Sequence, residues 1–411
     1  MAKSELKPKC GGLHMQNMKK FPLNYIGQFY SAATDENYPG VFSISMYLHE
    51  ELCSETLQQA VNDMAKRLPH FNVRKQSGSF WYYNEELPSP PVIEKQAGLA
   101  EPLRYFKDDA HLLRIIYGER HFTLEVSHAV CDGRTLAPVA VSLLIWYYHF
   151  LGVEISNEGF INLNDPTTPE ETEDAYVRYA DMRKFTTPEP RDVYIPTFKA
   201  VTTQTITYKI DLQKLKIAAK EHGVTVATYI AAHIFSEFAK QRAKENSDLP
   251  ITVHMPIDCR PYYPSKTMQN FVSHIIPTMP EAVDFTLMAR GIKSQFMALT
   301  PNYIQNIMSE VQALVYKADK IPLTAKKQQC MVDVGNRLYG GSSTGLSNLG
   351  VMTLPKELQE RVEMMTFALG PETGLPYLFG CITAGDTLTF TGTSTSEDTS
   401  IMDGLKQALT L

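Results

Sequence analysis

One short segment of the chain carries the residue types of general-base chemistry. In VSHAVCDGRTL, residues 126–136, His128 is followed by Asp132 and Gly133. A neutral imidazole can take a proton from an alcohol or an amine near pH 7, because its ordinary pKa lies close to that pH. Asp132 could orient the imidazole directly, as in a catalytic triad, or it could pair with an arginine and hold the segment. A core histidine whose ring is satisfied by a backbone carbonyl is the structural alternative.

The residues before His128 predict a β-strand that would position it. Phe122, Leu124 and Val126 alternate along the sequence and share a face with His128. His128 would therefore end the strand on its apolar side. The Asp-Gly pair then predicts a turn, with a helix beginning at residues 132–135. A histidine at this place is well positioned for a cleft between two layers.

The composition is that of an ordinary globular protein with a large core. The chain has 411 residues, of which 44% are hydrophobic and 20% are charged, enough for two or three domains or one two-lobed domain. The formal net charge of −6 predicts no basic face, so we expect no nucleic-acid partner.

No apolar stretch marks a signal peptide at the start of the sequence. Scattered cysteines without a C-x-x-C pair indicate reduced thiols, and we expect a cytoplasmic protein. The cysteines are Cys10, Cys53, Cys131, Cys259, Cys330 and Cys381.

The segment 135–153 could be mistaken for a membrane span. It contains no Asp, Glu, Lys or Arg and is close to the spanning length. However, Pro138, Ser142 and His149 interrupt it, and no second segment of this kind follows. We therefore predict a buried core helix and no membrane span.

Strand and helix patterns alternate in both halves of the chain. In the first half we expect strands at 41–48 and 78–85, a helix at 54–69 and a hairpin at 111–128. In the second half we expect strands at 201–211, 250–259 and 271–279, helices at 212–223 and 225–246, helical structure over 284–318, and a hairpin at 375–395. The Gly- and Ser-rich segment 340–350 predicts a loop.

Residues 163–200 are rich in Pro, Thr and acidic residues, which is typical of a linker. Each half of the chain opens with a strand followed by a helix. We therefore predict an α/β protein with mixed sheets and two similar lobes, at 1–175 and 176–411.

The sequence resembles the superfamily of chloramphenicol acetyltransferases, condensation domains and alcohol acetyltransferases. His128, Asp132 and Gly133 match its His-x-x-x-Asp-Gly motif, and further segments agree with it in order along most of the chain. These are LQQAVNDMAKRLPHFNVR, GVTVATYIAAHIFSEFAK, PIDCRPYYPSKTMQNFVSHIIPTMP and STGLSNLGVMTLP. The last resembles the Ser-Asn-Leu-Gly segment of the stand-alone alcohol acetyltransferases. Condensation domains usually double the histidine, but Ser127 precedes His128 here, and the Asp-Phe-Gly-Trp-Gly motif of plant acyltransferases is absent from the sequence.

The resemblance implies two acetyltransferase-like lobes that form a pseudo-dimer with a channel between them. His128 would lie midway in the channel and deprotonate the hydroxyl of a small-molecule acceptor, with an amine as the less favoured alternative, as the acceptor attacks a thioester carbonyl. The donor would be an acyl-CoA, most simply acetyl-CoA, acting as co-substrate with no permanently bound cofactor and no metal. Two alternatives stay open: an acyltransferase or condensation enzyme that depends on an acyl carrier protein, and a catalytically silent binding protein.

The resemblance also implies roles for residues around the motif. Asp132 would be structural and pair with an arginine, with Arg67 as the first candidate and Arg260 as the second. Gly133 would permit the turn and a close approach of the backbone. Arg260 and Asn270 would belong to a framework that crosses between the lobes.

A tetrahedral intermediate needs hydrogen-bond donors for its oxyanion. Ser347, Asn348 and the hydroxyl of Thr344 are the candidates, and a plain Gly/Ser loop is the alternative. The spacing in GLSNLG does not fit the nucleophile elbow of α/β-hydrolases, and the sequence contains no P-loop motif. The remaining histidines show no metal-ligand spacing.

Overall fold

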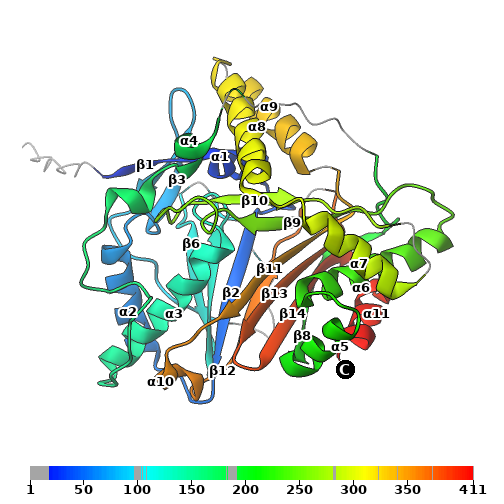
Figure 1. The fold of residues 1–411 in the computed structure, drawn as a ribbon. Coiled ribbons are helices and arrows are strands. Elements are labelled where there is room, and N and C mark those ends of the chain that lie inside the picture. The colour runs from blue at the N-terminus through cyan, green and yellow to red at the C-terminus, as the bar shows by residue number, and fades with distance from the viewer. Residues whose placement is uncertain are drawn as a thin grey trace, which may run out of the picture.

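The computed structural model describes residues 18–96, 103, 105–107, 109–181, 183, 192–280, 284–322, 324–339, 341–372 and 374–410. Within these residues the chain forms a mixed α/β structure of two lobes, as predicted (Figure 1).

The first lobe is built on a five-stranded sheet with the order β12-β2-β7-β6-β5. Its strands are β2 (Val41–Leu48), β5 (Glu94–Lys95), β6 (Leu113–Tyr117), β7 (His121–Ser127) and β12 (Val362–Leu369). Two helices, α2 (Ser54–Arg67) and α3 (Gly133–Phe150), lie side by side on this sheet (Figure 1). A small sheet with the order β1-β4-β3 lies beside it and contains β1 (Lys20–Pro22), β3 (Val73–Ser77) and β4 (Tyr82–Glu86).

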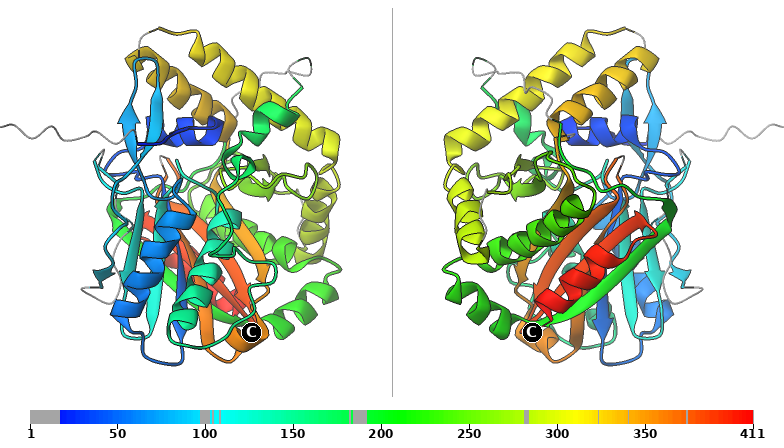
Figure 2. Two further views of the ribbon diagram at one scale, coloured as in Figure 1. Left: turned by 90° about the vertical axis from the view of Figure 1, so that its left-hand side faces the viewer. Right: turned by 90° about the vertical axis from the view of Figure 1, so that its right-hand side faces the viewer.

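The second lobe is built on a six-stranded sheet with the order β10-β9-β11-β13-β14-β8. Its strands are β8 (Ala200–Asp211), β9 (Val253–Asp258), β10 (Val272–Ile275), β11 (Thr344–Met352), β13 (Tyr377–Ala384) and β14 (Thr387–Ser396). Its helices are α5 (Leu212–Glu221), α6 (Val226–Lys244), α7 (Phe285–Phe296) and α11 (Ser400–Leu409). They pack on the outer face of the sheet, away from the first lobe (Figure 2).

A third group of helices lies across one end of both lobes (Figure 1, Figure 2). It comprises α1 (Tyr25–Ala33), α8 (Pro301–Asp319) and α9 (Thr324–Tyr339). Buried residues of α1 and α8 form a separate core with Tyr176 and Phe271. The short elements η1 (Pro169–Thr172), α4 (Ala175–Tyr179) and α10 (Lys356–Gln359) complete the described chain.

The longer predicted elements are confirmed. Thr225 caps α6 through its side chain, as a helix N-terminus requires, and Gly223 follows α5 with a positive φ of 73°. The hairpin of β13 and β14 turns at Gly385, whose φ is 58°. The helical stretch predicted at 284–318 is two helices, and the strand expected at 78–85 begins only at Tyr82.

The charge-free segment forms α3, in which nearly every side chain after the first turn is buried. Its apolar character is explained by contact with α2 and with β2. Within the part of the chain that the structure describes, no helix combines the length and the apolar character that crossing a membrane requires.

The predicted loop at 340–350 is wrong. Residues 344–352 form β11, which is parallel to both β9 and β13 at the centre of the second sheet. The small residues allow close packing there: a Cβ atom on Gly345 would lie 2.8 Å from Cδ2 of Leu378. A central strand can therefore have a composition that suggests a loop when the residues are considered alone.

The strand β12 crosses from the second half of the chain to the first lobe. It pairs antiparallel with β2, and Met365 and Phe367 are buried in the core of the first lobe. Residues after 176 therefore complete the sheet of the lobe predicted at 1–175. The boundary between the lobes stays a prediction, but the two cores are not independent in sequence.

Candidate active site

His128 lies at the C-terminal end of β7, in the turn that leads to α3. The strand ends at Ser127, and the backbone N–H of His128 donates to the carbonyl of Gly40 at 2.8 Å. The alternating residues 122, 124 and 126 are fully buried, which confirms the predicted inward face of the strand. The side chain of His128 itself is only partly buried.

Asn270 forms one hydrogen bond with the imidazole of His128 and a second with the backbone carbonyl of the same residue. The Nδ2 group of Asn270 donates to the carbonyl oxygen of His128 at 2.9 Å, so its Oδ1 atom must face the ring. Oδ1 lies 2.9 Å from Nδ1 of His128, and an amide oxygen can only accept. Nδ1 therefore carries the proton of the neutral ring, and Nε2 carries the free lone pair.

Two aromatic rings enclose the imidazole. Tyr30 from α1 stacks on it with ring centroids 4.3 Å apart and an interplanar angle of 2°. The ring of Phe42 from β2 packs against the imidazole with centroids 4.7 Å apart and an interplanar angle of 55°. Burial lowers the pKa of His128 below its ordinary value of 6.5, although the hydrogen bond to Asn270 and the charge of Asp132 oppose this shift. The ring is therefore a neutral base at pH 7.

Asp132 supports the site without touching the imidazole. One carboxylate oxygen accepts from the backbone N–H of Thr135 at 2.9 Å and caps α3. The other accepts from Arg260 at 3.1 Å and from the N–H of Phe271 at 2.8 Å. Because both oxygens are engaged in this way, Asp132 does not form a catalytic triad with His128. It pairs with an arginine instead, as a structural aspartate would.

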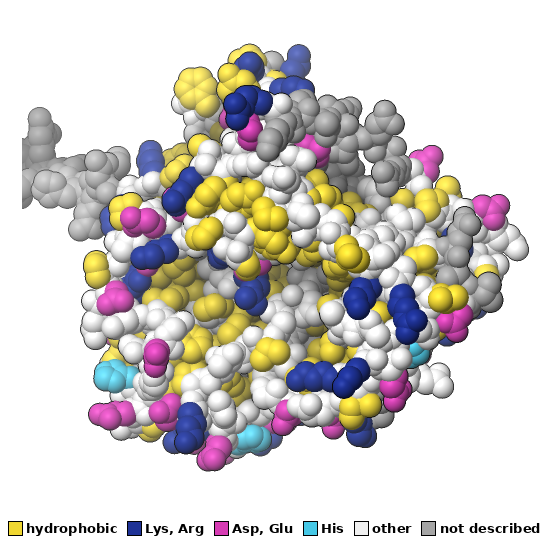
Figure 3. Space-filling view, viewed as in Figure 1, with side chains coloured by type: hydrophobic (Ala, Val, Ile, Leu, Met, Phe, Trp, Pro, Cys, Tyr) yellow, Lys and Arg dark blue, Asp and Glu magenta, His cyan; other side chains and the backbone are white. Residues whose placement is uncertain are grey.

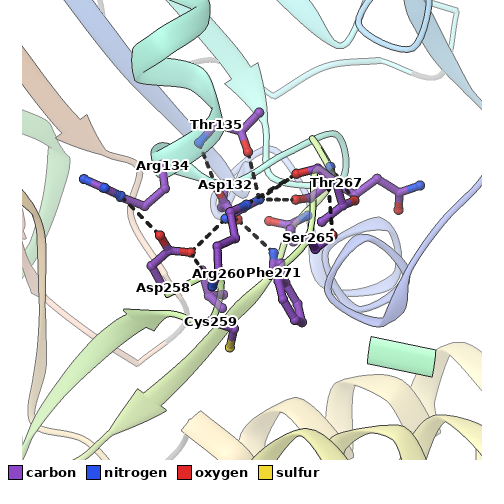
Figure 4. A network of polar contacts seen from close by, with 12 residues as sticks. Asp132, Arg134, Thr135, Asp258, Cys259, Arg260, Ser265, Thr267 and Phe271 are labelled. Carbon is purple, nitrogen blue, oxygen red and sulfur yellow. Dashed lines mark hydrogen bonds and ion pairs between the residues drawn. The ribbon is translucent and has the colours of Figure 1, made fainter. Parts of the chain in front are cut away.

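Arg260 is the centre of a network that joins the two lobes (Figure 4). Besides Asp132, it donates to Asp258 at 3.0 Å, to the hydroxyl of Thr135, and to two backbone carbonyls. Asp258 in turn lies 3.5 Å from Arg134, which donates to the carbonyl of Leu349 on β11. The start of α3 is thus tied to β9 and β11 of the second lobe.

The first candidate partner of Asp132, Arg67, is wrong. Arg67 makes two hydrogen bonds to Glu171, at 2.7 and 2.9 Å, and a third to the carbonyl of Asn162. It lies at the end of α2 and faces the segment 162–171. Its role is to attach that segment to the first lobe, whereas the second candidate, Arg260, is the partner of Asp132.

Gly133 allows the close approach that was predicted. A Cβ atom there would lie 2.9 Å from Leu349 and 3.3 Å from the ring of Phe367. Its backbone conformation is not left-handed, so the turn itself does not require glycine. Glycine is needed because the start of α3 packs directly on the crossing strands.

The three predicted oxyanion donors do not share one orientation. Side chains alternate along β11, and Thr344 donates its hydroxyl to the carbonyl of Tyr377 at 2.7 Å on the buried side. Ser347 is paired with Gly380, where a Cβ atom would lie 2.3 Å from the carbonyl oxygen of Phe367, so Ser347 faces the first lobe. Asn348 accepts from the N–H of Gly350 through its Oδ1, within the irregular part of the strand. Of the three, Ser347 is the one that faces the junction of the lobes.

The face shown in Figure 3 is hollowed between the two lobes, and hydrophobic side chains are visible in the hollow. A separate cavity of about 10 Å³ has Ser127 and Ala129 in its wall, on either side of His128 in the sequence, and has room for no more than one water molecule. A wider hollow of about 340 Å³ lies at Arg67, away from His128. No group of three or more potential metal ligands occurs among the described residues. The channel with separate donor and acceptor entrances stays a prediction.

The sequence identified His128 but not the residues that surround its ring. Asn270 was expected only in the framework, and Tyr30 and Phe42 were not singled out. Glu372, whose carboxylate accepts from the hydroxyl of Tyr30 at 3.2 Å, was also missed. These residues come from four separate segments, and no local pattern marks any of them.

No protein-family model matches the sequence, and no curated protein matches it significantly. Solved structures do match over nearly the whole chain. Polyketide synthase associated protein 5 from Mycobacterium tuberculosis aligns over 95% of this chain and 96% of its own, with 16% identity and a TM-score of 0.64. The first condensation domain of the CDA synthetase aligns over 95% and 94%, with 13% identity and a TM-score of 0.62. The epimerization domain from the third module of tyrocidine synthetase B aligns over 95% of both chains, with 10% identity and a TM-score of 0.58.

The chain therefore has the two-lobed fold of condensation domains. The placement in the stand-alone alcohol acetyltransferase branch stays a prediction. Condensation and epimerization domains share the fold, so the fold alone does not determine the reaction. The chemistry has to be argued from the residues of the site.

Proposed function

We propose that this protein is an acyltransferase that moves an acyl group, most simply acetyl, from a coenzyme A thioester to a hydroxyl of a small molecule. His128 is the general base. The observation that carries the proposal is the pair of hydrogen bonds between Asn270 and His128, because it fixes the tautomer with Nε2 unprotonated. A silent binding protein has no need of a base prepared in this way.

The proposed reaction uses this geometry in three steps. Nε2 of His128 takes the proton of the acceptor hydroxyl while the oxygen attacks the thioester carbonyl. The oxyanion of the tetrahedral intermediate accepts a hydrogen bond from Ser347. The intermediate then collapses, the carbon–sulfur bond breaks, and the imidazolium returns the proton to the thiolate. No acyl-enzyme forms, and Asn270 keeps the ring in one orientation throughout.

A carrier-protein thioester is the second candidate donor. It is favoured by the structural relatives, which include a polyketide synthase associated protein and domains of nonribosomal peptide synthetases. The chemistry at His128 would be the same, since both donors present a thioester. The two differ in whether free acyl-CoA supports turnover.

The test is thiol release from acetyl-CoA with pooled small alcohols and amines, followed by identification of the product. We expect acceptor-dependent release that falls about 10²–10⁴-fold in His128→Ala. His149→Ala, which removes an exposed histidine, is the matched control and should retain activity. Release that needs an acylated carrier protein would support the second donor. Release unchanged in His128→Ala would overturn the mechanism.

A further inference from the structure

Glu372 lies close to His128 on the other side of one strand. It belongs to the turn between β12 and β13, and the N–H of Gly370 donates to the carbonyl of Val41 at 2.7 Å. On the opposite edge of β2, the backbone N–H of His128 donates to the carbonyl of Gly40. The backbone around Gly40 and Val41 therefore binds the segment before Glu372 on one side and that of His128 on the other. The two segments lie two strand spacings apart, about 10 Å.

Tyr30 connects the carboxylate of Glu372 to the catalytic ring. Its ring lies parallel to the imidazole of His128 at 4.3 Å, and its hydroxyl donates to Oε1 of Glu372 at 3.2 Å. The carboxylate therefore lies at the hydroxyl end of the tyrosine ring that stacks on the imidazole. One aromatic side chain therefore separates the carboxylate from the imidazole.

The charge of Glu372 is not compensated within the described residues. No arginine or lysine there forms an ion pair with it, and the hydroxyl of Tyr30 is its one side-chain hydrogen-bond donor. Burial raises the pKa of this carboxyl group, and the hydrogen bond from Tyr30 offsets this in part. Buried carboxylates usually have a cationic partner.

Three other sheltered carboxylates of this chain follow that rule. Arginine partners are found for Asp132 at 3.1 Å, for Glu125 at 2.9 Å and for Glu171 at 2.7 Å. Glu372 differs from these three. Asp174 also forms no ion pair among the described residues, but it accepts from the backbone N–H of Tyr176 at 3.0 Å, at the start of a helix. Glu372 is the carboxylate of this kind beside His128. A cation supplied by the acceptor would complete its environment.

We infer that the acceptor is an amino alcohol, whose ammonium group binds the carboxylate of Glu372 while its hydroxyl lies at Nε2 of His128. This inference rests on the proposed function and names the class of acceptor. An ammonium group is compact and donates up to three hydrogen bonds, which suits a single carboxylate. Because it is protonated, it has no lone pair for attack on the thioester. Glu372 therefore also directs acylation to oxygen rather than to nitrogen.

The kinetic test compares two acceptors of equal size, 3-amino-1-propanol and 1-butanol, with acetyl-CoA as donor. We expect kcat/KM to favour the amino alcohol by about tenfold or more. In Glu372→Gln this preference should fall by about tenfold or more, because only the amino alcohol uses the charge of the carboxylate. Glu360→Gln, which changes an exposed carboxylate at the end of α10, should keep the preference. An equal loss with both acceptors, or no preference in the wild type, would overturn the inference.

A binding measurement separates this inference from the proposed function. Calorimetric titration of His128→Ala with the same two alcohols needs no turnover. Tighter binding of 3-amino-1-propanol that is lost when Glu372→Gln is added supports the site, even if no thiol is released from any donor. Equal binding of both alcohols rejects it, whatever the activity at His128.

Discussion

The hydrogen bond between His128 and Asn270 sets the tautomer of the proposed base, and its influence on the ring can be tested by a one-atom change. In Asn270→Asp, a negative charge faces Nδ1 and favours the imidazolium, so the pKa of His128 should rise. The wild-type kcat/KM should increase with pH through a value below 6.5 and stay level above it, because burial lowers this pKa. In the variant the acid limb should move up by about 1–3 pH units. The measurement is the pH dependence of kcat/KM between pH 5 and 9, a range of about four units around the histidine pKa.

Asn270→Ala gives the comparison for this prediction. It removes both hydrogen bonds and frees the ring to change its tautomer, so kcat should fall without an upward shift of the acid limb. If Asn270 were only part of the framework between the lobes, the two variants would lose activity together and keep the wild-type pH profile.

At the scale of the element, the strand geometry of β11 separates residues that seemed equivalent in the sequence. Ser347 faces the first lobe and Thr344 faces the core of the second. We expect Ser347→Ala to lower kcat by about 10²-fold with little change in KM, as for the loss of one oxyanion donor. Thr344→Val should leave kcat unchanged in the folded protein. It should lower the free energy of unfolding by about 1–3 kcal/mol, because the carbonyl of Tyr377 loses its partner. Steady-state kinetics and urea denaturation distinguish the two, and reversed effects would reject Ser347 as a donor.

The elements that could be predicted are those whose burial follows from their own sequence. The strand 41–48, the hairpin around Gly118 and the helix beginning after Thr225 carry regular patterns and local turn or cap residues. β11 and β12 were not found, because their environment is supplied by strands from distant parts of the chain. The same holds for the site: His128 and Asp132 lie in one motif, but Asn270 and Tyr30 reach it only through the packing of the two lobes.

At the scale of the whole molecule, the site lies where the lobes are joined. β12 carries the second half of the chain into the first sheet, and the core of that lobe includes Leu349 from β11. The network around Arg260 ties the start of α3 to β9 and β11 (Figure 4). The relative position of the base on one lobe and Ser347 on the other therefore depends on these contacts.

Arg260 and Arg67 allow stability and positioning to be separated, because each pairs with a sheltered carboxylate but only Arg260 adjoins the site. Replacement by methionine keeps much of the apolar stem and removes the charge. Both Arg260→Met and Arg67→Met should lose up to about 3–5 kcal/mol of unfolding free energy, since each leaves a carboxylate unpaired. Only Arg260→Met should also lower kcat/KM of the folded protein, by about 10²-fold, because a displacement of about 1 Å is sufficient for such a loss. Urea denaturation measures the loss of stability in each variant, and steady-state kinetics below the melting temperatures of both variants measure kcat/KM of the folded proteins. Equal activity losses per folded molecule would mean that the clamp at Arg260 stabilises the lobes without setting the geometry of the base.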